Sequence, residues 1–299
     1  MTQYVTPTLR TRTSLIVDIE HRLQDRGNRR WGDTEIVRAL NDALGTWVGR
    51  VHVPCIYTLT DGWGTGGVYE YAIPAYIPEE KMTPQRLVST AYVSLAGGSN
   101  QYVWEDLLGW DMEPDGAGGQ VLRTQFNEGR AGTAGDGRIL YWVENGPLPE
   151  TLYTPSGTVT ASTTTPILLP AYLDVGQSGF VKWDDEWMQY AGISNLPADG
   201  GTELQNVVRG VGGTAAVNHT GSTGKMDWGV AVTNLRLWGQ LYAQTMANLH
   251  GLLLTDGPGQ EREHHQWQMQ WQQQRADDFW KSWVPLAPRL KLSRRSGGE

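Results

Sequence analysis

The sequence predicts an α+β fold, in which helices from both chain ends form a core and two antiparallel β modules are inserted between them. Apolar residues recur at helical spacing near both ends, in residues 12–50 and 228–284. Between these ends, short alternating runs are separated by glycine pairs such as Gly66-Gly67, which is typical of antiparallel sandwiches or barrels. The single cysteine, Cys55, excludes an intrachain disulfide framework.

Residues 1–50 are predicted to form the N-terminal helical part of this core. The first helix has Thr11 and Thr13 as cap candidates, and its apolar stripe comprises Leu15, Ile16, Ile19 and Leu23. The second helix begins at Gly32, and Glu35 is placed to bond back to the helix start. Its apolar positions follow at helical spacing: Ile36, Val37, Leu40, Ala43, Leu44, Trp47 and Val48.

Residues 51–152 are predicted to form a β-sandwich-like module. Glycine and proline break this segment into short alternating runs, as expected for strands joined by turns. The candidate strands are Cys55–Leu59, Val68–Ile73, Leu87–Leu95, Tyr102–Trp104, Val121–Phe126 and Arg138–Glu144. A Ser/Thr-rich stretch follows at residues 154–165, and it is either a linker or an exposed strand.

Residues 153–227 are predicted to form a second, small β module. Period-2 alternation over residues 180–191, around an acidic turn, predicts a β-hairpin with one packed face. A glycine-rich loop starts at Arg209 and Gly210, where glycine permits the positive φ of a tight turn. We expect Arg209 to anchor this loop through carbonyl hydrogen bonds and His219 to close the module in the same way.

Helical spacing is expected to return after Asp227, and residues 228–284 form the C-terminal helical part of the predicted core. One helix face comprises Trp238, Leu241, Tyr242, Thr245, Leu249, Leu252 and Leu253. In the last helix, Gln260 to Trp283, the Trp267/Trp271 pair lies on a different face from Met269, Ala276, Trp280 and Trp283. A helix that is apolar on two sides is typical of one packed between neighbours, which fits a ring of subunits. Prolines exclude helix from residues 285–299, which are predicted to be an extended basic tail.

Composition limits the classes of function. The net charge of −8 argues against a dedicated nucleic-acid binder, which would ordinarily be basic. The residues near Met1 show no signal-peptide pattern, and no apolar run approaches the length of a membrane span. The 14 Trp against only 3 Phe are unusual, and tryptophan suits both cores and subunit interfaces.

Motifs for catalysis, nucleotides and metals are incomplete, so we expect no enzyme activity and no cofactor. The run from His219 to Lys225 superficially resembles a phosphate-binding loop, but Met226 replaces the required Ser or Thr. The adjacent His264 and His265 point about 100° apart on a helix and do not form an i, i+4 metal pair. His52 and Cys55 have ligand-like spacing but lack a second pair.

Three consecutive carboxylates could form a glycosidase site or a calcium site. They are Asp184, Asp185 and Glu186, and two tryptophans flank them. Consecutive residues at a hairpin tip splay apart, however, and no second acid can be identified by spacing. We therefore interpret these residues as a turn.

Two stretches resemble proteins of tailed-bacteriophage virions. Head-to-tail adaptor (connector) proteins begin with a short helix, then a Trp-x-Asp-x-Glu helix start and a Leu-Asn-x-Ala-Leu core. The similar residues are Arg30-Trp31-Gly32-Asp33-Thr34-Glu35-Ile36 and Leu40-Asn41-Asp42-Ala43-Leu44. A small β domain of phage virion proteins has Asp-Glu-x-x-x-Tyr in its hairpin and Arg-Gly-x-x-Gly-Thr-x-Ala-x-x-His at its end. Its counterparts are Asp185-Glu186, Tyr190, Arg209-Gly210-Val211-Gly212-Gly213-Thr214-Ala215-Ala216 and His219.

The resemblance implies a structural virion protein that joins the capsid to the tail. Such adaptors form a ring of about twelve subunits beneath the portal protein and continue the DNA channel. The implied partners are the portal protein, tail or nozzle proteins, fibres and further copies of this chain. Viral DNA would pass without sequence-specific binding, no membrane would be involved, and the virion neck would assemble in the host bacterial cytoplasm. The family's core is mainly helical, so residues 51–152 depart from its pattern.

Two sets of residues are expected to make the contacts of such a ring. The expected portal-docking tail comprises Leu286, Arg289, Leu290, Lys291, Leu292, Arg294 and Arg295. The expected helix-core and ring packing residues are Trp31, Ile36, Leu40, Leu44, Trp47, Trp238, Leu241, Trp267, Trp271, Trp280 and Trp283.

Another phage tail protein, such as a receptor- or carbohydrate-binding component, is the alternative. Tryptophan-rich β modules offer stacking platforms for sugars, and the region of Trp63, Trp104 and Trp110 is the candidate. Exposure discriminates the two functions, because a platform needs coplanar exposed rings whereas a connector buries them. An all-β hydrolase is a further alternative, but no acid pair or nucleophile can be nominated for it.

Overall fold

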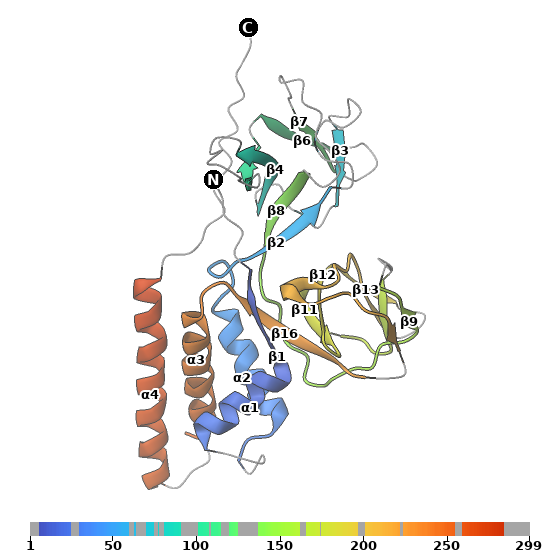
Figure 1. Cartoon of the computed structure of the whole chain (residues 1–299). Coiled ribbons are helices and arrows are strands. Elements are labelled where there is room, and N and C mark those ends of the chain that lie inside the picture. Colours follow the sequence, from blue (N-terminus) through green and yellow to red (C-terminus); the bar gives the residue numbers. More distant parts are fainter. Residues whose placement is uncertain are drawn as a thin grey trace. The chain divides into compact units, whose positions relative to one another are not determined.

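Antiparallel sheets occur in both of the compact units into which the chain divides in the computed structural model (Figure 1). One unit contains Pro54–Val143, and the other contains Thr6–Val53 and Glu144–Leu286. The structure describes residues 6–24, 30–59, 63, 70–74, 77, 81–90, 101–107, 109–114, 120–124, 137–161, 166–173, 175–196, 201–221, 224–254 and 259–283.

The first unit is built from two sheets. The four-stranded sheet has the order β2-β8-β4-β5, comprising Val53–Thr58, Gly137–Val143, Met82–Thr90 and Gln101–Asp106. The three-stranded sheet has the order β3-β7-β6, comprising Glu70–Ile73, Gln120–Thr124 and Trp110–Pro114. Every residue of β8 is buried, as expected for a strand covered on both faces.

The second unit contains a four-stranded sheet that joins distant parts of the sequence. Its order is β1-β16-β11-β12, comprising Thr8–Thr11, Met226–Val232, Ser178–Trp183 and Glu186–Ala191. A three-stranded sheet has the order β10-β14-β13, comprising Ile167–Leu169, Gly201–Leu204 and Ile193–Leu196. The two-stranded β9-β15 sheet comprises Thr158–Val159 and His219–Thr220, and a single 3-10 turn, η3, spans Val211–Gly213.

The four described α-helices all lie in the second unit: α1 (Arg12–Leu23), α2 (Asp33–Gly45), α3 (Arg236–Leu252) and α4 (Gly259–Ser282). At the start of α1, the Thr11 side chain accepts a hydrogen bond from the Ser14 N–H. At the start of α2, the Glu35 carboxylate accepts one from the Gly32 N–H at 2.9 Å. The predicted cap at Thr11 and the predicted role of Glu35 are therefore confirmed. The helix α3 packs against both α2 and α4.

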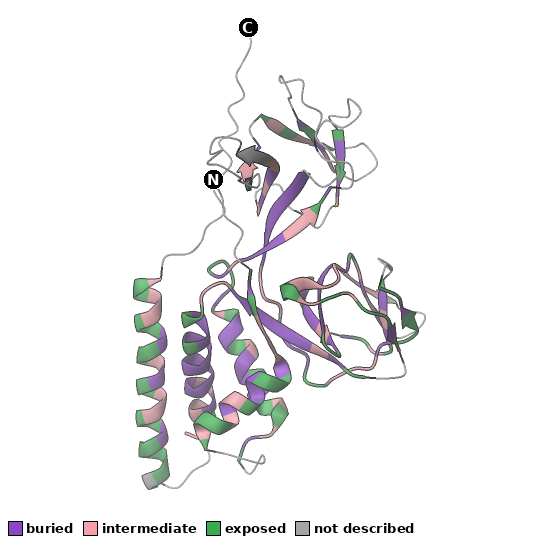
Figure 2. Cartoon of the chain, in the orientation of Figure 1, coloured by how far each residue is buried: buried purple, intermediate pink, exposed green. Residues whose placement is uncertain are grey.

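The predicted fold class is wrong, because the described residues are mostly β and the helices do not form a core of their own. Those residues form sixteen strands in five antiparallel sheets, against four α-helices. One hydrophobic cluster contains helix residues such as Ile36 and Leu241 together with strand residues such as Trp183 and Trp228. Figure 2 shows the buried faces of α1 to α3 and of the sheet in the second unit. The helices and the second β module thus share a core.

Two strands account for this difference. Strand β1 is a four-residue segment, and the sequence pattern predicts no strand there. Strand β16 occupies Met226–Val232, where helix is expected to return, and α3 begins only at Arg236. Almost every residue of β16 is buried, so its sequence shows no alternation that would reveal a strand.

Other predicted elements agree with the structure. Each candidate strand between residues 51 and 152 overlaps an observed strand, although β6 lies where no strand is predicted. The hairpin over residues 180–191 is confirmed, with Phe180 paired to Gln189 and a left-handed residue, Asp184, in the turn. Of the two alternatives for residues 154–165, a strand is present at Thr158–Val159.

We expect the substitution Gly229→Ala to destabilise the second unit. A Cβ at this position in β16 would lie 2.4 Å from Trp187 Cζ3 and 3.1 Å from the Arg10 carbonyl oxygen. Overpacking of this kind costs about 1–3 kcal/mol, which urea unfolding would measure. The matched control is Gly239→Ala in α3, where nothing lies within 4 Å of the added Cβ. There we expect a gain of about 0.5–1 kcal/mol, and equal effects at both positions would contradict the argument.

Candidate functional site

The most highly connected polar cluster of the second unit surrounds Glu186, the first residue of β12. Arg209 donates to both carboxylate oxygens, from Nε and from Nη2, at 2.6 Å each. The backbone N–H groups of Gly210 and Val217 donate at 3.0 Å each. The Nε2 atom of His219 lies 2.9 Å from the second oxygen. The side chain of Glu186 is completely buried, so this set of donors replaces its water.

The local sequence explains how these groups converge. The turn at Asp184 directs Glu186 inward at the start of β12. After Arg209, three glycines adopt positive φ, at Gly210, Gly212 and Gly213. At Gly210 a Cβ would also lie only 3.0 Å from the Thr214 carbonyl oxygen, so the loop requires glycine there.

Arg209 and His219 contact the same carboxylate. Arg209 donates to the carbonyl oxygen of Thr160 at 2.8 Å and to that of Val217 at 2.5 Å. The His219 ring stacks on Trp183 at 4.6 Å between centroids, and its Nδ1 lies 3.0 Å from Asp184 Oδ2. Both side chains are thus used in fixing the loop to the hairpin.

The cluster leaves little room for chemistry. Both oxygens of Glu186 already accept several hydrogen bonds, and the side chains of Glu186 and His219 are shielded from solvent. Within the described residues, no group of three or more His, Cys, Asp or Glu could hold a metal ion. The arrangement is that of a structural cross-link. Its acceptor, Glu186, is the residue that the sequence argument treats only as part of a turn.

The predicted packing residues of the helices fall into three classes of exposure. Buried are Trp31, Ile36, Leu40, Leu44, Trp47, Trp238 and Leu241. Half-buried are Trp280 and Trp283, which pack against the edge of the core. Exposed are Trp267 and Trp271. The predicted portal-docking residues from Leu286 to Arg295 lie outside the described residues, as does the rest of the basic tail.

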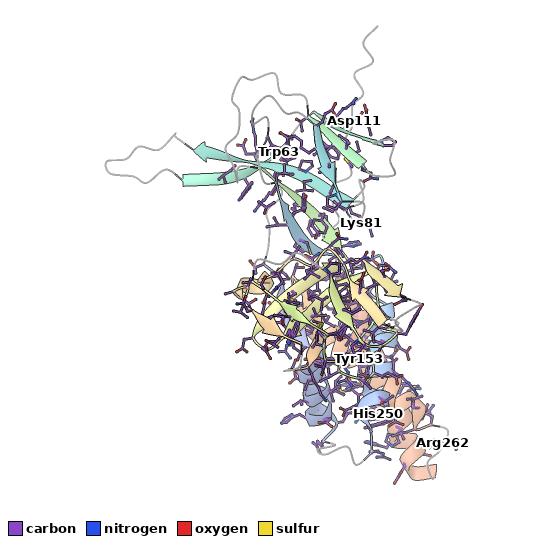
Figure 3. The ribbon with its side chains drawn as sticks, turned by 90° about the vertical axis from the view of Figure 1, so that its right-hand side faces the viewer. Trp63, Lys81, Asp111, Tyr153, His250 and Arg262 are labelled. Carbon is purple, nitrogen blue, oxygen red and sulfur yellow. The ribbon has the colours of Figure 1, made fainter. Side chains whose placement is uncertain are left out.

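The candidate sugar platform in the first unit is not a row of exposed rings. Trp63, labelled in Figure 3, is buried, donates to the Gln85 carbonyl oxygen at 2.7 Å and packs edge-on against Tyr71. The guanidinium of Arg138 covers the ring of Trp104 at 3.9 Å. Trp110 is half-buried in β6.

A cavity of about 440 Å³ lies beside the C-terminal end of α3, near His250 (Figure 3). Arg30, Trp31 and His265 are among its lining residues. The Nδ1 atoms of His250 and His265 lie 3.1 Å apart, so one nitrogen must donate and the other accept. Burial, followed by the nearby positive charges of His265, His264 and Arg30, lowers the pKa of His250 to about 4. Sequence spacing gave no signal for this pair, because it joins two helices.

We expect Glu186→Gln to destabilise the second unit by about 3–5 kcal/mol, because it leaves the buried Arg209 without its counter-charge. Burial alone raises the pKa of Glu186, but hydrogen bonds from Arg209, Val217 and His219 outweigh it and lower the pKa below 4.5. Its stabilisation is therefore present above pH 4.5 and is lost as the pH falls through the lowered pKa. Urea unfolding at a series of pH values should show that the free energy of unfolding falls at acid pH in the wild type and that this fall is absent in the variant.

A separate acid effect is expected from His250. Because its pKa is lowered from 6.5 to about 4, the folded state takes up the proton less readily than the unfolded state. Stability is thus full above pH 6.5 and falls as the pH approaches 4. The variant His250→Gln should have a flatter stability profile in this window and an unchanged one below it. If the slope of stability against pH between pH 4 and 6.5 were the same in the variant and the wild type, this assignment would be contradicted.

Comparison with known proteins gives no identification. No protein-family model, no curated protein and no solved structure matches the chain. Among the described helices, none is both long enough and apolar enough to cross a membrane.

Proposed function

We propose that this chain is a structural subunit of a head-to-tail adaptor ring in a tailed bacteriophage. In this role it binds beneath the portal protein, joins the capsid to the tail and continues the channel through which DNA passes. The observation that carries the proposal is the adaptor-like motif of residues 30–44, in which residues 30–32 lead into α2 and residues 33–44 lie in it.

The motif residues of α2 have definite structural uses. Trp31 is buried in the helical part of the core, and Glu35 caps the helix through the Gly32 N–H. The side-chain amide of Asn41 donates to the Leu148 carbonyl oxygen at 2.9 Å and accepts from the Leu148 N–H at 2.8 Å. Asn41 therefore fixes the chain just before the second β module begins. These motif residues thus have roles in folding, which is compatible with a structural protein.

The second motif supports the same proposal. Its residues Glu186, Arg209, Gly210 and His219 meet in one saturated cluster that holds a loop against a hairpin. A buried and fully hydrogen-bonded cluster of this kind suits the β module of a structural virion component.

Charge suits the proposed channel. Each subunit carries a net charge of −8, so a channel lined by surface of average character would repel DNA. Transit of DNA favours weak contact, whereas a basic channel would hold the duplex through many phosphate contacts.

The proposal is tested by measuring the mass of the purified protein with and without portal rings. Light scattering and electron microscopy should detect either a rotationally symmetric ring or a subunit that assembles into one only on the portal of the same phage. A subunit that remains indifferent to portal rings would contradict the proposal.

Deletion of residues 286–299 is expected to abolish portal docking while leaving the two units folded. We expect this basic tail to make its contacts on the portal protein rather than within either unit. Circular dichroism and the melting temperature serve as the folding control. Docking that is unchanged by the deletion would exclude the tail as the docking element.

A further inference from the structure

The outer face of α4 exposes two tryptophans. Trp267 is 57% exposed and Trp271 is 43% exposed, whereas His265, Gln272 and Ala276 on the opposite face are buried. Figure 2 shows α4 as an edge helix of the second unit with an exposed outer side. Exposed large aromatic groups in a pair mark an interaction surface more often than a solvated face.

These tryptophans belong to a ladder of stacked groups. The two rings are 6.0 Å apart between centroids and within 5° of parallel. The guanidinium of Arg275 lies over the Trp271 ring at 4.8 Å. Trp267 and Arg275 lie four residues before and after Trp271, and both stack on its ring. A sugar platform needs free ring faces, so this arrangement favours a protein partner.

Glu263 extends the ladder by one turn toward the start of α4. Positions 263, 267, 271 and 275 follow at four-residue spacing over about 18 Å, and all four residues are exposed. Within the described residues, Glu263 forms no ion pair. The stripe therefore presents an acid, two aromatic rings and a base in that order.

The order of these four residues is complementary to the same order in a second helix that runs in the opposite direction. If two α4 helices lie antiparallel, Glu263 of each copy faces Arg275 of the other, and Trp267 faces Trp271. A parallel arrangement instead brings like charges together. Stripes of four-residue spacing pack with helices crossing at about 50°.

We propose that the outer face of α4 forms a twofold contact with a second copy of this chain, centred between Trp267 and Trp271. The contact goes beyond the proposed function, because neighbours within a ring meet head to tail rather than across a twofold axis. The four tryptophans cover about 500 Å² in total, which is below the ~1,200–2,000 Å² of stable specific interfaces, so the contact is a weak one. The dimer is accordingly expected to form in the micromolar range.

The test is sedimentation velocity of the full chain from about 1 to 200 µM, a range that spans weak association. The wild type should shift from monomer to dimer across this range. Trp267→Ser with Trp271→Ser should raise the dissociation constant about a hundredfold. Arg275→Glu should raise it about tenfold, because both charge pairs become repulsive.

Exchanging the two charges distinguishes a specific charge pairing from a general loss of dimer affinity. The double variant Glu263→Arg with Arg275→Glu restores both pairs and should return the dissociation constant to within about threefold of the wild type. Arg262→Glu is the matched control, since it reverses an exposed charge beside the stripe and should change nothing. Melting temperatures check that every variant is folded.

Three results would overturn the inference: a wild type that remains monomeric, an assembly indifferent to the tryptophan and charge variants, or a charge exchange that fails to restore the dimer. A closed ring that is unaffected by these variants would overturn this contact and leave the proposed function standing.

Discussion

The second unit depends on the antiparallel pairing of β1 with β16. These strands lie more than two hundred residues apart in the sequence, yet Thr8 pairs with Val232 and Thr11 with Gly229. Helix α1 follows β1 directly, and α3 follows β16 after a short turn. Because the two strands are antiparallel, α1 leaves one end of the strand pair and α3 leaves the other end. The pairing thus ties the two chain ends together, in addition to the direct packing of α3 against α2.

Polar contacts reinforce this junction. Arg10 in β1 forms an ion pair with Asp18 of α1, and it donates to the hydroxyl of Tyr242 in α3 at 2.5 Å. The Tyr242 hydroxyl in turn donates to Asp18 at 2.7 Å. Burial, then the hydrogen bond to Asp18, raises the pKa of Tyr242, which keeps its proton in place for this bond. One strand and two helices are thus joined by groups that are only partly accessible to water, where such bonds are stronger than at the surface.

The sequence predicted the elements whose signals are local. The start of α2 could be read from Gly32 and Glu35, because the bond from the Gly32 N–H to the Glu35 carboxylate needs only neighbouring residues. The hairpin around Asp184 was visible for the same reason. Strand β1 could not be found, since four residues acquire strand character only from a distant partner. In β16, burial on both faces removed the alternation that marks a strand, and this error led to the wrong fold class.

The candidate site shows the same division between local and distant signals. The roles of Arg209 and His219 were expected from a glycine-rich loop, but the acceptor that joins them, Glu186, is more than twenty residues earlier in the chain. A carboxylate at a hairpin tip is normally interpreted as a solvent-exposed turn residue. Only the position of the covering loop shows that Glu186 is buried. The sequence pattern could therefore identify Arg209 and His219, but it could not show that Glu186 is buried between them as the acceptor of a cross-link.

Most tryptophans pack inside the two units, and two of them are exposed on α4. All 14 tryptophans lie in the described residues, and twelve of them are buried or half-buried, so most serve the two units' own packing. Trp267 and Trp271 differ because the face that α4 turns toward α3 is already filled by side chains such as His265 and Ala276. Two exposed indoles leave a large apolar area in contact with water, and folding of the single chain gains little from them. Their stacked order, flanked by Glu263 and Arg275, makes more physical sense as one half of a contact than as a solvated face.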